Sequence, residues 1–318
     1  MSRFPFGIPN SWFHVGYSDE LAKGQVKAIH FLGKEMVMFR GEDGKVGVLD
    51  AYCPHIGAHL GIGGKVVGNA VACPFHSWKF DCTGKCVDIP YTKKIPAKAV
   101  AGAYTVREHS GIIFIWHHAE GKAPDFDIPV IEQFGAEDWT RTYLKYVWKV
   151  RTQPQEIMEN AIDWPHFHSV HGMAMPPDKQ EKFEGKMFYW RIGTTKQIAT
   201  MGGVTDNFLI QAQNWGLGFN FLTYDGMFST VVTAGLTPID EEYTLFQTGI
   251  IGKKDGRSED ETIALLKAYM DDQSNAITQD FEIWEHKAYR PTPALCDGDG
   301  PVARYRKWAS QFYSQPAA

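Results

Sequence analysis

The sequence predicts an α+β protein of two domains. An all-β domain is expected over residues 1–130, and a domain that combines an antiparallel sheet with helices over residues 131–318. Three observations support this prediction. The length of 318 residues and the hydrophobic fraction of 44% suit two domains that each bury a core. Short apolar runs alternate with Gly-rich turns in the first half, and longer strands interrupted by two helical segments follow in the second.

The first half of the chain has the pattern of a small β protein. Short apolar runs alternate with Gly-rich turns between Gln25 and Trp116, and no helical period competes with them. We therefore expect a small sandwich or barrel. The expected strands include residues 36–39, 46–49, 71–73 and 112–116.

The second half follows a Pro-rich linker at residues 123–129 and mixes strands with two helices. The first helix is expected from Pro154, which suits a first helical turn, to about His171, with Gly172 as its C-cap. The second begins after Ser258, which forms a capping box with Glu261, and extends to about residue 289. Strands are expected at residues 140–150, 186–192, 208–213, 230–236 and 244–251.

Composition narrows the class of function. The formal net charge of -5 leaves no basic excess for phosphates, so we expect no nucleic-acid partner. The first residues lack the continuous apolar stretch of a signal peptide, and no transmembrane segment is expected. Five cysteines cannot all pair within one chain, and two of them have metal-ligand spacing, which favours a reducing compartment, the cytoplasm.

The strongest motif lies in the first half. Cys53 and His55 form a C-x-H pair, and after 17 intervening residues Cys73 and His76 form a C-x-x-H pair. Zinc modules usually pair like ligands, whereas each half here supplies one thiolate and one imidazole. This arrangement suits a Rieske-type [2Fe–2S] cluster, in which two cysteines hold one iron and two histidines hold the other. Zinc and a metal-free packing of the four side chains are the alternatives.

Nearby histidine and cysteine residues fit the cluster less well. The C-x-H spacing selects His55, so His59 is expected at the surface. Cys82 and Cys86 have no further histidine or cysteine beside them, and we expect them to be packing thiols.

A second candidate metal site lies in the first predicted helix. Asn160, Asp163 and His166 recur at three-residue intervals, so they share a helix face. A kink at Pro165 would turn His171 toward the same face. The pattern predicts a site with two imidazole ligands, and a zinc site or a salt-bridged core is the alternative.

Two imidazoles need an anionic third ligand to form the two-His-one-carboxylate triad of Fe(II) enzymes that activate O₂. Asp280 in the second helix is the candidate, because a carboxylate on an apolar helix face must be paired or bound to metal. Its apolar neighbours at helical spacing are Ile277, Ile283 and Trp284. The other acids of this helix lie off that face or about two turns earlier: Glu282, Glu285, Asp271 and Asp272.

With both motifs in one chain, the sequence resembles the Rieske non-heme iron oxygenases from Trp12 to about Tyr313. Within that family it is most similar to the oxygenase components of bacterial 3-ketosteroid 9α-hydroxylases. The similar segments are LDAYCPH from Leu49, ACPFHSW from Ala72, IPY from Ile89, QDFEIW from Gln279, Leu295–Asp297, Asp299–Pro301 and Arg306–Trp308.

The resemblance implies a helix-grip-like sheet in the second domain and a mononuclear iron held by His166, His171 and Asp280. It also implies that Asp163 relays electrons from the cluster ligand His76 of a neighbouring subunit to His166. That arrangement requires a ring of subunits, commonly a homotrimer. Asn160 is expected with Asp163 among the catalytic residues.

The resulting prediction is a terminal monooxygenase that hydroxylates a small hydrophobic substrate, a steroid or another polycyclic ring, with O₂. Electrons from NAD(P)H should arrive through a separate reductase, with or without a ferredoxin, because no G-x-G-x-x-G fingerprint follows a strand. The alternatives are dihydroxylation, dealkylation or desaturation of an aromatic or alkylated compound. A non-enzymatic Rieske electron carrier would not need the second domain.

The segment from Met173 to about Lys254, where the resemblance is weakest, is expected to supply the substrate pocket with apolar and aromatic side chains, although each of them also suits ordinary core packing. The candidates are Met173, Met175, Phe188, Trp190, Trp215, Phe219, Phe221, Tyr224 and Met227.

Overall fold

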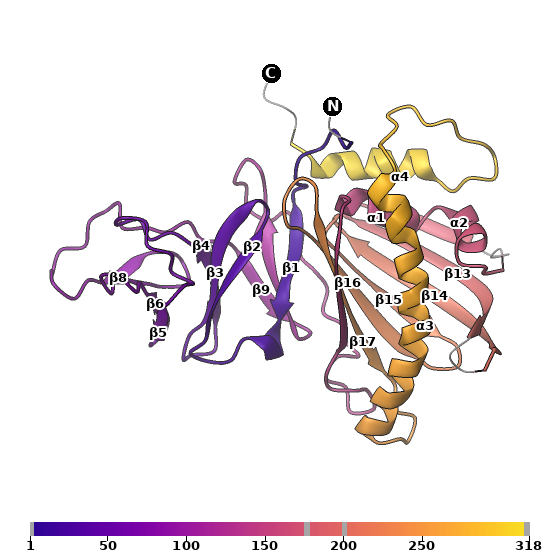
Figure 1. The fold of residues 1–318 in the computed structure, drawn as a ribbon, viewed down its shortest axis with the longest axis horizontal. Coiled ribbons are helices and arrows are strands. Elements are labelled where there is room, and N and C mark those ends of the chain that lie inside the picture. The colour runs from indigo at the N-terminus through magenta and orange to yellow at the C-terminus, as the bar shows by residue number, and fades with distance from the viewer. Residues whose placement is uncertain (1–2, 175–178, 199–201, 315–318) are drawn as a thin grey trace. The chain divides into compact units, whose positions relative to one another are not determined.

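The computed structural model describes residues 3–174, 179–198 and 202–314, without the side chains of residues 196, 198 and 272–275. The chain divides into two compact units, residues 13–117 and residues 1–12 with 118–318. Figure 1 shows that the first is built from strands and that the second combines a sheet with helices. The predicted fold class is confirmed. The domain boundary between residues 130 and 131 stays a prediction.

The smaller unit contains three sheets, with strand orders β1-β10-β9, β2-β3-β4 and β5-β6-β7-β8. Its core packs strand residues such as Val37, Leu49 and Phe80 around the buried Cys53 and Cys73. The strands are β1 (Ser11–Tyr17), β2 (Val26–Phe31), β3 (Lys34–Arg40), β4 (Val46–Asp50), β5 (Lys65–Val67), β6 (Ala70–Ala72), β7 (Lys79–Phe80), β8 (Cys86–Asp88), β9 (Val106–His109) and β10 (Ile112–His117).

The larger unit is organised by a seven-stranded antiparallel sheet in the order β11-β17-β16-β15-β14-β13-β12. All five predicted strands are present with shifted ends, and β12 and β15 were not predicted. The strands are β11 (Leu144–Val150), β12 (Lys179–Glu184), β13 (Met187–Ile198), β14 (Val204–Trp215), β15 (Phe219–Asp225), β16 (Thr230–Pro238) and β17 (Thr244–Gly252).

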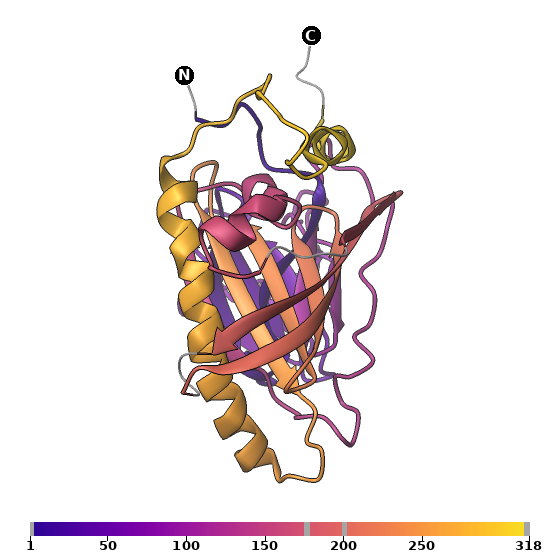
Figure 2. The ribbon, with the colours of Figure 1, turned by 90° about the vertical axis from the view of Figure 1, so that its right-hand side faces the viewer.

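Helices α1 (Pro154–Asn160), α2 (Trp164–Ser169) and α3 (Glu259–His286) lie on one face of this sheet (Figures 1 and 2). The predicted capping box is confirmed, because the Ser258 side chain accepts from the Glu261 N–H and the Glu261 carboxylate accepts from the Ser258 N–H. A fourth helix, α4 (Val302–Ala309), and short 3-10 turns at Ser18–Glu20 and Ser310–Phe312 were not predicted. Within the described residues, no helix has the length and apolarity that a membrane span requires.

The helix predicted from Pro154 to His171 is instead two short helices. Backbone N–H groups of residues 161–163 donate to carbonyls only three residues earlier, so the chain tightens and turns between α1 and α2. Pro165 lies in the first turn of α2, where its missing N–H costs nothing, and it therefore starts a helix where a kink was predicted. Asp163 is the N-cap residue of α2.

Candidate metal centres

The two loops of the C-x-H and C-x-x-H motifs have the same backbone hydrogen-bond pattern. The Cys53 N–H donates to the carbonyl of Ala58 at 2.9 Å, and the Cys73 N–H donates to the carbonyl of Trp78 at 2.8 Å. In both loops the acceptor lies five residues after the cysteine. The backbone thus holds both cysteines in equivalent turns.

The equivalence extends to the residue four positions after each cysteine. Gly57 and Ser77 both have a left-handed backbone, with φ of 83° and 57°, and each donates its N–H to the carbonyl of its own cysteine. Glycine adopts this conformation freely, whereas serine adopts it at a steric cost. The second loop therefore keeps the shape of the first despite a less suitable residue.

The side chains of the four predicted cluster ligands converge between these loops. Cys53 and Cys73 are each 3% exposed, and burial, together with the neighbouring Cys73 thiol, raises the pKa of Cys53 to about 11. The rings of His55 and His76 lie 4.8 Å apart, centroid to centroid, and the buried Nδ1 of His76 has no hydrogen-bond partner among the described residues. Two buried thiols and an unpartnered imidazole nitrogen fit a [2Fe–2S] cluster of the Rieske type.

The exposed imidazole of His55 lies against a fixed aromatic ring. The Trp78 indole stacks on it with centroids 4.4 Å apart and planes 10° apart, and the indole N–H donates to the Tyr91 hydroxyl at 2.6 Å. Around these loops, large apolar side chains are more than half exposed: Tyr52, Ile56, Ile62, Phe75 and Tyr91. Apolar exposure of this kind is typical of interaction surfaces.

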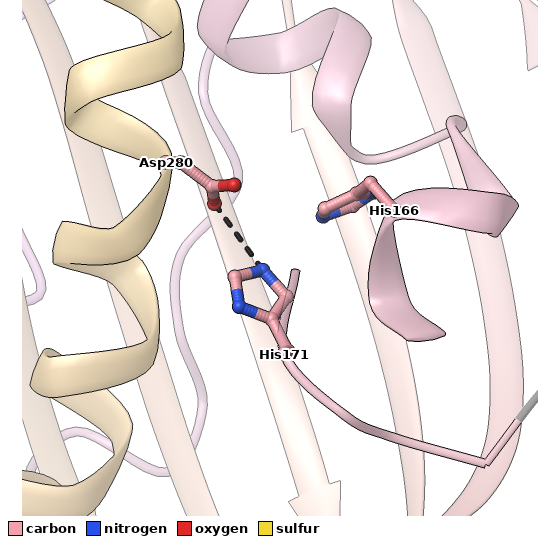
Figure 3. A group of neighbouring side chains, drawn as sticks. All are labelled: His166, His171 and Asp280. Carbon is pink, nitrogen blue, oxygen red and sulfur yellow. Dashed lines mark ion pairs between the residues drawn. The ribbon is translucent and has the colours of Figure 1, made fainter. Parts of the chain in front are cut away.

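In the larger unit, the structure brings His166, His171 and Asp280 together. His166 belongs to α2, His171 follows that helix, and Asp280 projects from α3 (Figure 3). One ligand atom from each residue lies within 4.8 Å of the other two, and His171 Nε2 lies 3.3 Å from Asp280 Oδ2. Two imidazoles and one carboxylate at this spacing fit a facial triad for Fe(II).

Each imidazole of this trio has an oxygen partner on its Nδ1. His166 Nδ1 is hydrogen-bonded to the backbone carbonyl of Asp163, and His171 Nδ1 lies 3.0 Å from Gln279 Oε1. A carbonyl oxygen accepts only from a protonated Nδ1, so both Nε2 atoms carry the lone pair that a metal needs. Burial lowers the pKa of His166, which also favours the neutral ring that binds metal.

The other two predicted catalytic residues surround His166. Asn160 Nδ2 lies 3.0 Å from His166 Nε2. Burial raises the pKa of Asp163, while His166 and Lys287 act in the opposite direction. Because α1 and α2 are separate, Asn160 and His166 meet across a turn and not along one helix face.

Ion pairs to two buried glutamates hold α1 against the C-terminal segment. Arg306 of α4 makes a two-pronged contact with Glu159, with N–O distances of 2.6 and 2.8 Å. Lys287 lies directly after α3, and its Nζ is 2.8 Å from Oε2 of the buried Glu156. The planar guanidinium–carboxylate pair orients α1 against α4, and the Lys287 contact ties α1 to the end of α3, the helix that carries Asp280.

A cavity opens beside the trio between the helices and the sheet. His166, His171 and Asp280 line it together with mainly apolar side chains from β13 to β17 and α3. Of the predicted pocket residues, Met173, Trp190 and Tyr224 line the cavity. Met175 lies outside the described residues. The remaining candidates lie elsewhere, mostly in the core: Phe188, Trp215, Phe219, Phe221 and Met227.

Comparison with known proteins identifies a family for each part of the chain. Residues 11–101 match the Rieske [2Fe-2S] domain, and residues 115–313 match the 3-ketosteroid 9alpha-hydroxylase C-terminal domain. The chain belongs to the 3-ketosteroid 9α-hydroxylase family of Rieske oxygenases. As such an oxygenase, it uses a [2Fe–2S] cluster, a mononuclear iron, O₂ and electrons from a reductase.

Relatives of this oxygenase include a 3-ketosteroid-9-alpha-monooxygenase oxygenase component of Rhodococcus rhodochrous, 32% identical over 95% of this chain and 82% of the relative. A cholesterol 7-desaturase of Hemicentrotus pulcherrimus is also 32% identical, over 96% of this chain and 70% of the relative. Among solved structures, dicamba monooxygenase bound to dicamba has a TM-score of 0.76 at 19% identity, covering 96% of this chain and 98% of that one. That similarity shows the same fold.

Three features of the oxygenase escaped the sequence prediction. Gln279 contacts His171 but was named only as the first residue of a similar segment. Trp78 was part of a similar segment, and its stacking on His55 depends on loop geometry. Asn220 and Thr248 line the cavity from strands of mainly apolar residues, and their polarity was a signal that could have been used.

Proposed function

We propose that this oxygenase hydroxylates a steroid or a similar polycyclic compound, as the terminal component of a multicomponent system. The observation that carries the proposal is the trio of His166, His171 and Asp280 at the wall of an apolar cavity. Relatives named for steroid monooxygenation and cholesterol desaturation support the substrate class.

Cys53, His55, Cys73 and His76 are proposed to hold the [2Fe–2S] cluster. When bound, the cluster transfers single electrons. The chain's own part is to hold two buried thiols in equivalent turns and to leave the two imidazoles near the surface, where electrons enter and leave. Trp78 keeps the ring plane of the exposed His55 fixed by stacking.

His166, His171 and Asp280 are proposed to hold the mononuclear iron through His166 Nε2, His171 Nε2 and an Asp280 oxygen. A bound iron with three protein ligands has positions left for O₂ chemistry. The protein fixes both imidazole tautomers through Asp163 and Gln279. The apolar walls bind the substrate and exclude water from the reacting carbon.

Asp163 and Asn160 are proposed to act beside the iron, with Asp163 connecting His166 to the cluster ligand His76 of a neighbouring copy in a homotrimer. The exposed apolar side chains around the cluster loops, such as Ile56 and Phe75, support a protein contact there. Asp163 is suited to the role because it already contacts His166 through its backbone.

A separate reductase, with or without a ferredoxin, is proposed to deliver electrons from NAD(P)H. We also propose a cytoplasmic location. All five cysteines are unpaired, which is typical of a reducing compartment.

A single turnover tests the proposed function. The holoenzyme is reduced chemically, mixed with ¹⁸O₂ and a 3-ketosteroid, and its products are analysed by mass spectrometry. One labelled oxygen in the steroid is expected. A desaturated steroid without label would mean that the enzyme catalyses dehydrogenation and not hydroxylation. Cluster reoxidation only with a non-steroid compound would overturn the substrate class.

A further inference from the structure

The cavity wall contains polar atoms that no described residue satisfies. Asn220 Oδ1, Thr230 Oγ1 and Thr248 Oγ1 are buried and without a hydrogen-bond partner among the described residues, and all three residues line the cavity. Thr230 and Thr248 are each only 1% exposed. A buried unsatisfied polar group typically costs about 1–3 kcal/mol. Groups retained at such a cost inside an apolar cavity point to a polar atom on the ligand.

Two of these groups share one row of the sheet. Asn220 of β15 pairs with Ala234 of β16, and Ala234 pairs with Thr248 of β17. Asn220 and Thr248 therefore flank the small methyl group of Ala234, about 10 Å apart between their Cα atoms. All three line the cavity, so an atom placed above Ala234 has a polar side chain on each side.

Thr230 is a separate polar position on the cavity wall. It lies four residues before Ala234 on β16, about 13 Å away along the strand. Its cross-strand partner is Tyr224, which also lines the cavity. Thr230 and Thr248 therefore contact different parts of any rigid ligand. A substitution of Thr230 can serve as the control for the same substitution of Thr248.

We propose that Asn220 and Thr248 bind one oxygen atom of the substrate above Ala234 and thereby orient the substrate against the trio of metal ligands. The inference rests on the proposed function and specifies it further: the substrate is an apolar polycycle with a ketone or hydroxyl oxygen. The Thr248 hydroxyl can donate to a ketone or accept from an alcohol. Asn220 Oδ1, as placed, accepts from an alcohol, and a half-turn of the amide presents the Nδ2 donor to a ketone. A site built this way rejects an analogue that lacks the oxygen, because its own groups then stay unpaired.

The test measures binding and not turnover. Equilibrium dissociation constants of the holoenzyme are determined without reductant for three probes: a steroid with a single ketone on ring A, one with a single ketone on ring D, and the parent hydrocarbon. The variants are Thr248→Val and Asn220→Leu, which keep the approximate shape of the side chain. Thr230→Val is the matched control, because it removes an equally buried hydroxyl from the same cavity. Thermal unfolding verifies that each variant folds.

Wild-type protein should bind one of the ketones about tenfold more tightly than the hydrocarbon. Thr248→Val and Asn220→Leu should each remove most of that difference while hydrocarbon binding stays unchanged, and Thr230→Val should preserve it. If the ketone preference persists in both variants, or is lost only in Thr230→Val, the assignment to Asn220 and Thr248 is wrong. If no steroid binds the wild-type protein, the proposed substrate class fails first, and the oxygen site fails with it.

Discussion

The two candidate metal sites hold their ligands by different means. Between Cys53 and His76, four ligands come from two neighbouring loops whose backbone hydrogen bonds match. His166 and Asp280, in contrast, are far apart in the sequence, and side-chain contacts such as Gln279 to His171 set the ligand geometry. The comparison suggests that backbone conformation determines the cluster site, whereas packing of helices and neighbouring side chains determines the iron site.

The largest expected effect tests whether the two sites are independent. His171→Ala should lose the mononuclear iron and keep the cluster, because the cluster ligands lie in the other compact unit. Cys73→Ser should lose the cluster and keep the mononuclear iron. Iron and acid-labile sulfide content, with electron paramagnetic resonance of each centre, measure both. Loss of mononuclear iron in Cys73→Ser would show that the two sites assemble together.

The difference between the sites also explains what could be predicted from sequence. The cluster ligands could be predicted from the spacing of cysteine and histidine in two short segments, since a local motif fixes its own geometry. Asp280 was selected over other acids by its apolar neighbours, and the structure does place it beside both histidines. The break between α1 and α2 was missed, because a proline after an N-cap residue can start a helix as readily as bend one.

The cavity was harder to predict for a reason specific to strands. Side chains alternate between the two faces, and a strand of mainly apolar residues does not reveal which face is which. Phe219 and Phe221 were therefore proposed as lining residues, whereas the intervening Asn220 and the following Leu222 line the cavity. Only the register of the folded sheet decides which of these side chains face the cavity.

The second prediction concerns communication between the sites. Asp163→Ala should retain both metals and lose nearly all coupled turnover, because the proposed connection from a neighbouring copy to His166 would be missing. Rapid mixing of reduced protein with O₂ and substrate follows the reoxidation of the cluster. Asp271→Ala, on α3 and remote from the trio, is the control and should turn over normally. Normal reoxidation in Asp163→Ala would remove the relay role.

The third prediction addresses the side-chain support of the iron site. Gln279→Leu removes the acceptor for His171 Nδ1 and should weaken iron binding about 10- to 100-fold. Gln279→Glu keeps an oxygen at that position and should retain more of the affinity. Competition with a chelator, at constant cluster content, measures the change. Equal affinity in Gln279→Leu and wild type would mean that packing alone orients the His171 ring.

The smallest effect tests the backbone support of the cluster site. Gly57 and Ser77 occupy equivalent left-handed positions, and an added Cβ at Gly57 meets no atom within 4 Å. Gly57→Ala should therefore destabilise the unit only through its backbone conformation, by about 1 kcal/mol, and Ser77→Gly should stabilise it by a similar amount. Ser77→Ala separates the hydroxyl from the backbone effect and should leave stability nearly unchanged. Calorimetric unfolding of the holo-protein measures all three variants. Opposite shifts for Gly57→Ala and Ser77→Gly would demonstrate that the two loops are held by the same turn, whereas a loss of stability in Ser77→Gly would mean that the serine side chain supports the second loop by contacts of its own.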